Sequence, residues 1–246
     1  MSKIALITGA SSGIGWATAQ AFAQKGINLV LCGRRKEKLE ALKNELSSKV
    51  SCQILVFDVA NKDEVQNAIN TIDKIDILVN NAGNAHGFSS VDAGNLSDYD
   101  AMIDSNVKGL LYVSKAVLPK MVSQKSGHVI NISSVAGKQT YANGTVYCAT
   151  KKAVEAISEG MRLDLTQHGI KVTNIAPGAV ETEFSEVRFK GDKDRAKKVY
   201  EGFEPLLAKD IADAISYAVS VPDHVTIADM TIYAKAQSAP TTVYKK

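Results

Sequence analysis

The stretch that decides the fold reads Lys3-Ile4-Ala5-Leu6-Ile7-Thr8 and continues as Gly9-Ala10-Ser11-Ser12-Gly13-Ile14-Gly15. Its first half predicts a short apolar strand, and a helix is expected from about Trp16 to Lys25. Between them, Gly9 suits a tight turn with positive φ, Gly13 admits a phosphate close to the backbone, and Gly15 lets helix and strand approach. The free N–H groups and positive dipole end of the helix then favour a pyrophosphate.

The rest of the chain alternates apolar runs with helical patterns. Strands are predicted near residues 3–8, 28–32, 52–57, 76–79, 128–133, 170–176 and 226–233, with helices between them. Longer helices are predicted near 97–125 and 145–168, and the second has an apolar stripe of Val154, Ile157, Met161 and Leu165. This alternation predicts an α/β protein with a parallel, doubly wound sheet and right-handed crossovers.

Length and composition are typical of one domain covering residues 1–246. The chain has 246 residues, 45% of them hydrophobic, and no linker, repeat or low-complexity tract interrupts the alternation. The first residues enter a strand directly, so we expect no leader peptide, and no segment approaches the run of about 18 apolar residues that spans a bilayer. The cysteines, Cys32, Cys52 and Cys148, lie in or beside buried-looking segments and predict reduced thiols in a cytoplasmic protein.

Charge and histidine content exclude two other classes of function. The net charge is only +3, and the lysines are scattered along amphipathic helices such as 35–49, which argues against nucleic-acid binding. His86, His128, His168 and His224 have neither the close spacing nor the Cys, Asp or Glu company of a metal site. We therefore expect no metal and no nucleic-acid partner.

A proton-transfer group is predicted around Tyr147. Lys151 follows four residues later, so on a helix the phenol and the ammonium share one face. A tyrosine with its ordinary pKa of about 10 shuttles protons poorly near neutrality, and a neighbouring cation favours the phenolate and lowers that pKa. Ser134 ends the buried-looking run 128–134, and in an open α/β sheet that end of a strand faces the ligand crevice.

These motifs together resemble the short-chain dehydrogenase/reductase family, and the resemblance covers nearly the whole chain. The motifs are Thr8 to Gly15, Asp58-Val59, Asn80-Asn81-Ala82-Gly83, Asn106, Ser134, Tyr147 with Lys151, and Pro177-Gly178 followed by Thr182. The resemblance implies a Rossmann fold with a seven-stranded parallel sheet in the order 3-2-1-4-5-6-7 and helices on both faces. It also implies that the two long helices pack in a homotetramer, with a dimer as the alternative.

The resemblance assigns roles to individual residues. The implied catalytic residues are Asn106, which binds an active-site water, Ser134, Tyr147 and Lys151. Asp58 and Val59 are expected at the adenine, Asn81 and Gly83 at the ribose, and Thr182 at the nicotinamide carboxamide. The implied cofactor-binding set is Gly9, Ser11, Ser12, Gly13, Ile14, Gly15, Arg34, Arg35, Asp58, Val59, Asn81, Ala82, Gly83, Tyr147, Lys151, Pro177, Gly178, Val180 and Thr182.

Cofactor choice is predicted from the residues after the second strand. Folds selective for NAD place an acidic side chain there, which bonds the ribose 2′-hydroxyl and repels a 2′-phosphate. Here the segment is Leu31-Cys32-Gly33-Arg34-Arg35, with no acid and two guanidinium groups that suit a phosphate. NADP(H) is the predicted cofactor.

The C-terminal run 182–192 and the tail to Gln237, together with residues 102–106 and 117–119, are similar to a narrower subgroup, the NADP-dependent 3-hydroxy acid dehydrogenases. That subgroup implies a hydride transfer on serine, allo-threonine, 3-hydroxypropionate or a related small acid. Arg188 or Lys190 would bind the substrate carboxylate, with Ser134, Tyr141 and Tyr147 as further substrate contacts.

One departure keeps other functions open. Several members of the subgroup have Trp-Pro-Tyr before the catalytic tyrosine, whereas this chain has Lys138-Gln139-Thr140-Tyr141 and retains only Tyr141. A broad NADPH-dependent carbonyl reductase of non-acidic ketones or aldehydes is therefore an alternative. An alternative of another class is a non-catalytic NADPH-binding sensor, although such a protein would be expected to lose a catalytic group.

Overall fold

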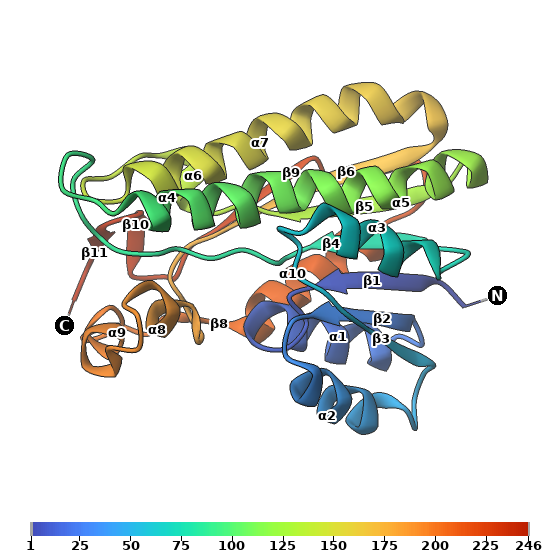
Figure 1. Cartoon of the computed structure of the whole chain (residues 1–246), viewed down its shortest axis with the longest axis horizontal. Coiled ribbons are helices and arrows are strands. Elements are labelled where there is room, and N and C mark those ends of the chain that lie inside the picture. The colour runs from blue at the N-terminus through green and yellow to red at the C-terminus, as the bar shows by residue number, and fades with distance from the viewer. Residues whose placement is uncertain (1, 246) are drawn as a thin grey trace.

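The computed structural model describes residues 2–245 and has a central parallel sheet between two layers of helices (Figure 1). The predicted strand order 3-2-1-4-5-6-7 is confirmed, with β9 as the seventh strand. Across the sheet the strands are β3 (Cys52–Val56), β2 (Asn28–Gly33), β1 (Ile4–Thr8), β4 (Ile77–Asn80), β5 (Gly127–Ile132), β6 (Ile170–Pro177) and β9 (Asp229–Ile232). Each neighbouring pair is parallel, so all seven carboxyl ends meet at one edge.

Alternating side chains on the strands build one apolar core on each face of the sheet. Ala5 and Ile7 pack with α1 (Gly13–Gln24), α2 (Lys36–Leu46) and α10 (Ala208–Ser220). Leu6 points to the opposite face, whose helices are α3 (Lys62–Asn70), α5 (Leu110–Gln124) and α7 (Thr145–Leu165). Helices on both faces are what a doubly wound sheet requires.

The helix predicted at 97–125 is interrupted once. It consists of α4 (Leu96–Ile103), a π-helical turn η1 (Asp104–Gly109) and then α5. At the end of η1 a Cβ on Gly109 would lie 2.8 Å from Val59 Cγ2, so only glycine fits against that loop. The helix predicted at 145–168 is α7 followed by a short 3₁₀ turn, η2 (Thr166–His168).

Several short elements beyond the carboxyl edge of the sheet were not predicted. They are α6 (Val135–Lys138), β7 (Val180–Glu181), α8 (Phe184–Arg188), α9 (Lys193–Lys198), β8 (Leu206–Leu207), and the pair β10 (Gln237–Ala239) and β11 (Thr242–Val243). In Figure 1, α8, α9, β10 and β11 lie on the left, past the end of the sheet. They leave a cleft between this group and the glycine turn after β1.

Two classes of feature are missing from the part of the chain that the structure describes. No helix within residues 2–245 is long and apolar enough to cross a membrane. Within the same residues, no three His, Cys, Asp or Glu side chains gather as a metal site would require. The outermost residues of the predicted domain, 1 and 246, lie outside the described range.

Candidate active site

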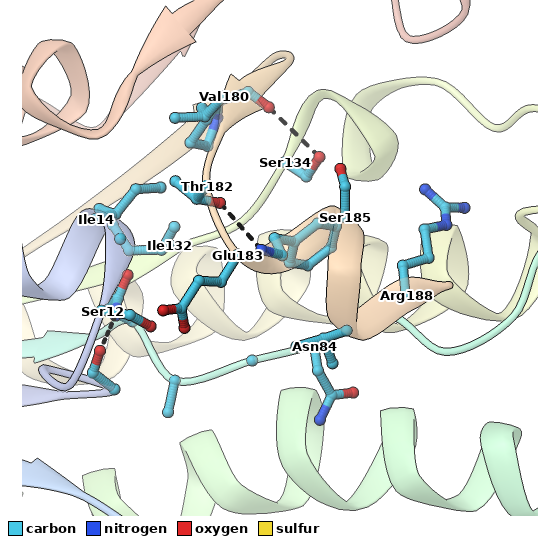
Figure 2. A pocket seen from close by; sticks show the side chains of 18 of the residues that line it. Ser12, Ile14, Asn84, Ile132, Ser134, Val180, Thr182, Glu183, Ser185 and Arg188 are labelled. Carbon is cyan, nitrogen blue, oxygen red and sulfur yellow. Dashed lines mark hydrogen bonds between the residues drawn. The ribbon is translucent and has the colours of Figure 1, made fainter. Parts of the chain in front are cut away.

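One cavity of about 460 Å³ opens at the carboxyl edge of the sheet and gathers nearly all the predicted site residues. Figure 2 shows Ser12 and Ile14 at one end, Arg188 at the other, and Thr182, Glu183 and Ser185 between them. The predicted residues lining it are Gly9, Ser11, Ser12, Gly13, Ile14, Arg34, Arg35, Asp58, Val59, Asn81, Ala82, Gly83, Ser134, Tyr141, Tyr147, Lys151, Pro177, Gly178, Val180, Thr182 and Arg188. Gly15 and Asn106 are not in its lining and lie behind it.

The glycine turn has the geometry that its sequence predicts. Gly9 and Gly13 have φ of +66° and +54°, which side chains disfavour. A Cβ on Gly15 would lie 2.5 Å from the Gly9 carbonyl oxygen, so this glycine permits the close approach of α1 to β1. The residue after the neighbouring strand β4 stabilises the turn, because Asn81 Nδ2 donates to Thr8 O at 2.9 Å.

The two arginines after β2 lie at the rim of the cavity in different environments. Arg34 Nη1 is 3.3 Å from Asp58 Oδ2, and its side chain is 71% exposed. Arg35 donates to Ser12 Oγ at 2.7 Å and to Glu183 Oε2 at 2.8 Å, so it spans from the glycine turn to the opposite rim. This hydrogen bond from Arg35 lowers the pKa of Glu183. Glu183 was not predicted as a site residue, although it directly follows Thr182.

Tyr147 and Lys151 are both buried on the same face of α7. Lys151 Nζ lies 6.0 Å from the Tyr147 ring centroid and donates to Ile132 O at 2.9 Å. Burial lowers the pKa of Lys151 to about 8, and it raises the pKa of Tyr147 above its ordinary value. The pKa of Tyr147 therefore lies above its ordinary value and not below it as expected, because burial outweighs the groups that lower it, Ser134 and Arg188.

Ser134 and Asn106 flank this pair from two other elements. The Ser134 hydroxyl caps α6 by accepting from Ala136 N at 3.1 Å, and it acts on the Tyr147 phenol, whose pKa it lowers. Asn106, in the π turn η1, donates from Nδ2 to Thr150 Oγ1 at 3.0 Å and accepts from Asn84 N at 2.8 Å. Its side chain therefore ties η1 to α7 and to the loop after β4.

Arg188 places a cation directly beside the candidate proton donor. Its guanidinium carbon lies 4.9 Å from the ring centroid of Phe88, 5.7 Å from that of Tyr141 and 5.6 Å from that of Tyr147. Nη2 donates to the Tyr141 hydroxyl at 3.1 Å. Phe88 was not predicted here; neither its spacing nor its neighbours in the sequence mark it.

Two other cations, the alternative candidate Lys190 and the loop residue Lys138, are already paired with carboxylates. Lys190 Nζ is 3.0 Å from Asp98 Oδ2. Lys138 Nζ contacts both Glu155 Oε2 and Asp229 Oδ2 at 2.5 Å, and neither lysine lines the cavity. Arg188 is thus the candidate that faces the site.

The cavity suits a dinucleotide on the evidence of its own residues. Its glycine turn brings bare backbone to the surface, and two arginines without an acid at the end of β2 suit an extra phosphate. A Cβ on Gly13 would lie 3.3 Å from Thr182 Cγ2, so the two rims of the crevice are close at this point. A buried tyrosine and lysine and a half-buried serine at the far end are able to move a proton to or from a bound alcohol or carbonyl oxygen.

This sheet, turn and Ser134–Tyr147–Lys151 arrangement define a class of oxidoreductase, and comparison with known proteins identifies it. The short chain dehydrogenase family matches residues 3–193, and the chain belongs to that family.

Within the family, the chain is 42% identical over 240 residues to the NADP-dependent 3-hydroxy acid dehydrogenase YdfG of Salmonella typhi, covering 96% of each chain. It is 41% identical over 232 residues to sulfoacetaldehyde reductase 2 of Chromohalobacter salexigens, covering 92% of each. It also resembles the closed form of a serine dehydrogenase complexed with NADP+, with 40% identity, a TM-score of 0.92 and 99% of each chain covered. The resemblance to the 3-hydroxy acid dehydrogenases is thereby confirmed.

Proposed function

We propose that this protein is an NADP-dependent oxidoreductase of small 3-hydroxy acids such as serine, allo-threonine or 3-hydroxypropionate. It interconverts the carbinol and the carbonyl of the substrate. The relatives named for 3-hydroxy acids, serine and sulfoacetaldehyde support this assignment.

The observation that carries the substrate class is the position of Arg188. Its guanidinium lies 5.6 Å from the ring of Tyr147, the proposed proton donor. A 3-hydroxy acid has its carboxylate only two carbons from the carbinol, so both groups fit a short span between a cation and an acid–base residue. Sulfoacetaldehyde has a comparable separation between its sulfonate and its carbonyl carbon, which suits the same cation.

In the proposed mechanism, the side chains of the protein orient the substrate and transfer one proton. When bound, the nicotinamide supplies or accepts the hydride. Tyr147 protonates the developing alkoxide in the reductive direction, and Ser134 donates a hydrogen bond to the same oxygen. Lys151 favours the phenolate and holds the ribose, while Asn106 keeps η1 and α7 in register behind them.

The proposed cofactor contacts are arranged along the lining of the cavity. The glycine turn from Gly9 to Gly15 would receive the pyrophosphate, Arg34 and Arg35 the 2′-phosphate, and Asp58 with Val59 the adenine. Asn81 to Gly83 would lie at the ribose, and Pro177 to Thr182 at the nicotinamide. These assignments rest on the family motifs and on the position of the residues around one cavity.

The decisive test is an absorbance assay of NADPH with purified protein. Serine, allo-threonine and 3-hydroxypropionate are compared with neutral alcohols of equal size, each with NADP and NAD, and sulfoacetaldehyde is compared with neutral aldehydes. We expect turnover of the acids with NADP. Preference for neutral carbonyls would favour the broad carbonyl reductase instead, and NADPH binding without turnover of any substrate would favour the sensor.

We further propose that the chain forms one domain, assembles as a homotetramer with a dimer as the alternative, and acts in the cytoplasm. Exposed Leu96, Ile103, Leu111 and Leu163 on α4, α5 and α7 support the assembly, because such side chains gain from burial. The three free cysteines support a reducing compartment. Light scattering after gel filtration tests the oligomer.

A further inference from the structure

A closed ring of polar side chains includes Glu155, one helical turn after Lys151 on α7. Lys138 contacts Glu155 and Asp229, and Asn174 Nδ2 donates to Glu155 Oε1 at 2.9 Å and to Asp229 Oδ2 at 2.7 Å. The four residues come from α6, α7, β6 and β9, so the ring joins four elements. The side chains of Lys138 and Glu155 are only 30% and 16% exposed, which limits screening by water.

The orientation of Asn174 is fixed by these charges. Asn174 is buried, and its amide oxygen has no partner while its amide nitrogen serves both carboxylates. Turning the amide over would satisfy neither carboxylate and would set one acceptor against two others. The two carboxylates therefore determine which way the Asn174 amide points.

The ring is coupled to the candidate catalytic groups in two ways. Through the backbone, α6 presses on α7 at Lys151: a Cβ on Gly137 would lie 2.8 Å from the Lys151 carbonyl oxygen, and Ser133 Oγ donates to the same oxygen at 3.2 Å. Through charge, Glu155 lies one helical turn after Lys151 and raises its pKa, partly opposing burial.

We infer that Lys138, Glu155, Asn174 and Asp229 form a positioning cluster, which fixes α6 and the Tyr141 loop against α7 and sets the pH range in which Tyr147 and Lys151 work. The inference rests on the proposed function and adds residues to its site. It also gives a role to Lys138, which directly precedes Gln139 and Thr140, where this chain departs from the Trp-Pro-Tyr of the subgroup. None of the four residues touches the cavity, so they act only through the pair.

The pair faces few other charges. Arg188 from α8 and Tyr141 from the loop after α6 both act on Tyr147, as does Cys148 on α7. Glu155 is the charged group that acts on Lys151. Removing the negative charge of Glu155 should lower the pKa of both members of the pair, and removing the positive charge of Lys138 should raise both.

The experiment measures kcat/KM against pH for the parent, Glu155→Gln and Lys138→Met. We expect the pH at which kcat/KM changes to move lower in Glu155→Gln and higher in Lys138→Met. Each shift should be about 0.3 to 1 pH unit. Lys138→Arg should restore the parent profile. Lys209→Met is the matched control, because Lys209 pairs with Asp213 on an exposed face of α10 and should shift nothing.

If the ring had only a structural role, the substitutions would lower the stability of the protein without moving the pH profiles of the two variants in opposite directions. Shifts in the same direction, or none in Glu155→Gln, whose side chain has nearly the same shape, would overturn the inference. The comparison uses any substrate that the parent turns over, so a wrong substrate assignment leaves it intact. If the parent turns over nothing, the proposed function fails, and the pH dependence of NADPH binding in the same variants, read by fluorescence, tests the cluster.

Discussion

At the scale of single residues, the environment of Tyr147 decides its chemistry. Burial raises the pKa of its phenol, so the hydroxyl is held as an acid. Tyr147→Phe removes only that hydroxyl, and we expect folding and NADPH binding to persist while turnover falls about 10²- to 10⁴-fold. Steady-state kinetics together with a fluorescence titration of NADPH check this, and turnover within a few-fold of the parent would remove Tyr147 from the mechanism.

Arg188 tests the substrate class. Arg188→Ala should weaken the use of a hydroxy acid by about 10- to 100-fold in kcat/KM while sparing a neutral carbonyl, because a charge-assisted hydrogen bond contributes about 1.5–3 kcal/mol. Arg195→Ala is the matched control: Arg195 also stacks on an aromatic ring, that of Phe189 at 4.4 Å, but it is exposed and does not line the cavity. Equal losses for acidic and neutral substrates would mean that Arg188 only supports the packing of α8.

Arg34 tests cofactor choice more cleanly than Arg35 does. Arg34 has a single carboxylate partner, Asp58. Arg35 instead donates hydrogen bonds both to the glycine turn, at Ser12, and to Glu183. Arg34→Asp should therefore move the preference from NADPH toward NADH by about 10- to 100-fold, since the new carboxylate repels a 2′-phosphate. The ratio of kcat/KM for the two cofactors measures it. A parent that already prefers NADH would contradict the assignment.

Residue identities along the cavity could be predicted because their motifs are local. The glycine turn, Ser134 and the Tyr147–Lys151 spacing each occupy a few consecutive positions. Phe88, Glu183 and the Lys138 ring could not, since each depends on contacts between distant segments. The direction in which the pKa of Tyr147 shifts was mispredicted for the same reason. The spacing of Tyr147 and Lys151 indicates a nearby cation, but it does not indicate how completely the fold excludes water from the phenol.

At the scale of elements, the junction of β1 and α1 depends on one missing side chain. In Gly15→Ala the new Cβ would meet the Gly9 carbonyl oxygen at 2.5 Å and Asn81 Nδ2 at 2.6 Å, both of them held in place. We expect a loss of about 1–3 kcal/mol in the free energy of unfolding and weaker NADPH binding.

Chemical denaturation measures that loss, and Gly160→Ala provides a control of opposite sign. Gly160 lies inside α7 with nothing within 4 Å of its Cβ position, so alanine should stabilise by up to about 1 kcal/mol. Equal stabilities of the two variants would contradict the packing described for the turn.

The strands and long helices could be predicted because each has enough residues for its period to be visible. Short elements such as β7, α8 and the pair β10 and β11 have too few residues to show one. The π turn was missed since the apolar pattern of 97–125 is compatible with an uninterrupted helix. The strand predicted at 226–233 contracts to Asp229–Ile232.

At the scale of the whole molecule, a buried histidine makes stability depend on pH. Burial lowers the pKa of His128 to about 3. The Thr173 hydroxyl donates to Ile227 O at 2.6 Å, so it accepts from Nε2 of a neutral His128 at 2.8 Å. The unfolded chain takes up this proton near pH 6.5, so it binds more protons than the folded protein between pH 6.5 and 3.

Stability should therefore fall as the pH drops below about 6.5, with about 2 kcal/mol lost from this group at pH 5. Denaturation of the parent and of His128→Gln at pH 7 and pH 5 measures it. The variant is expected to lose less between the two conditions, whatever its stability at pH 7. Identical losses would show that His128 is protonated in the folded state.

The π turn at Asp104–Gly109 has a consequence for how this chain tolerates insertions and deletions. A π turn holds one residue more than an α-helical turn, and each residue of a helix rotates the next by about 100° around the axis. Deleting one residue there would convert the π turn to an α-helical turn and rotate Val113, Val117 and Met121 away from the sheet, unless α4 rotated instead and carried Met102 out of its own cluster. The apolar faces of α4 and α5 are in phase only because of the extra residue, so descendants of this gene can exchange the exposed Lys108 side chain far more easily than they can shorten the turn.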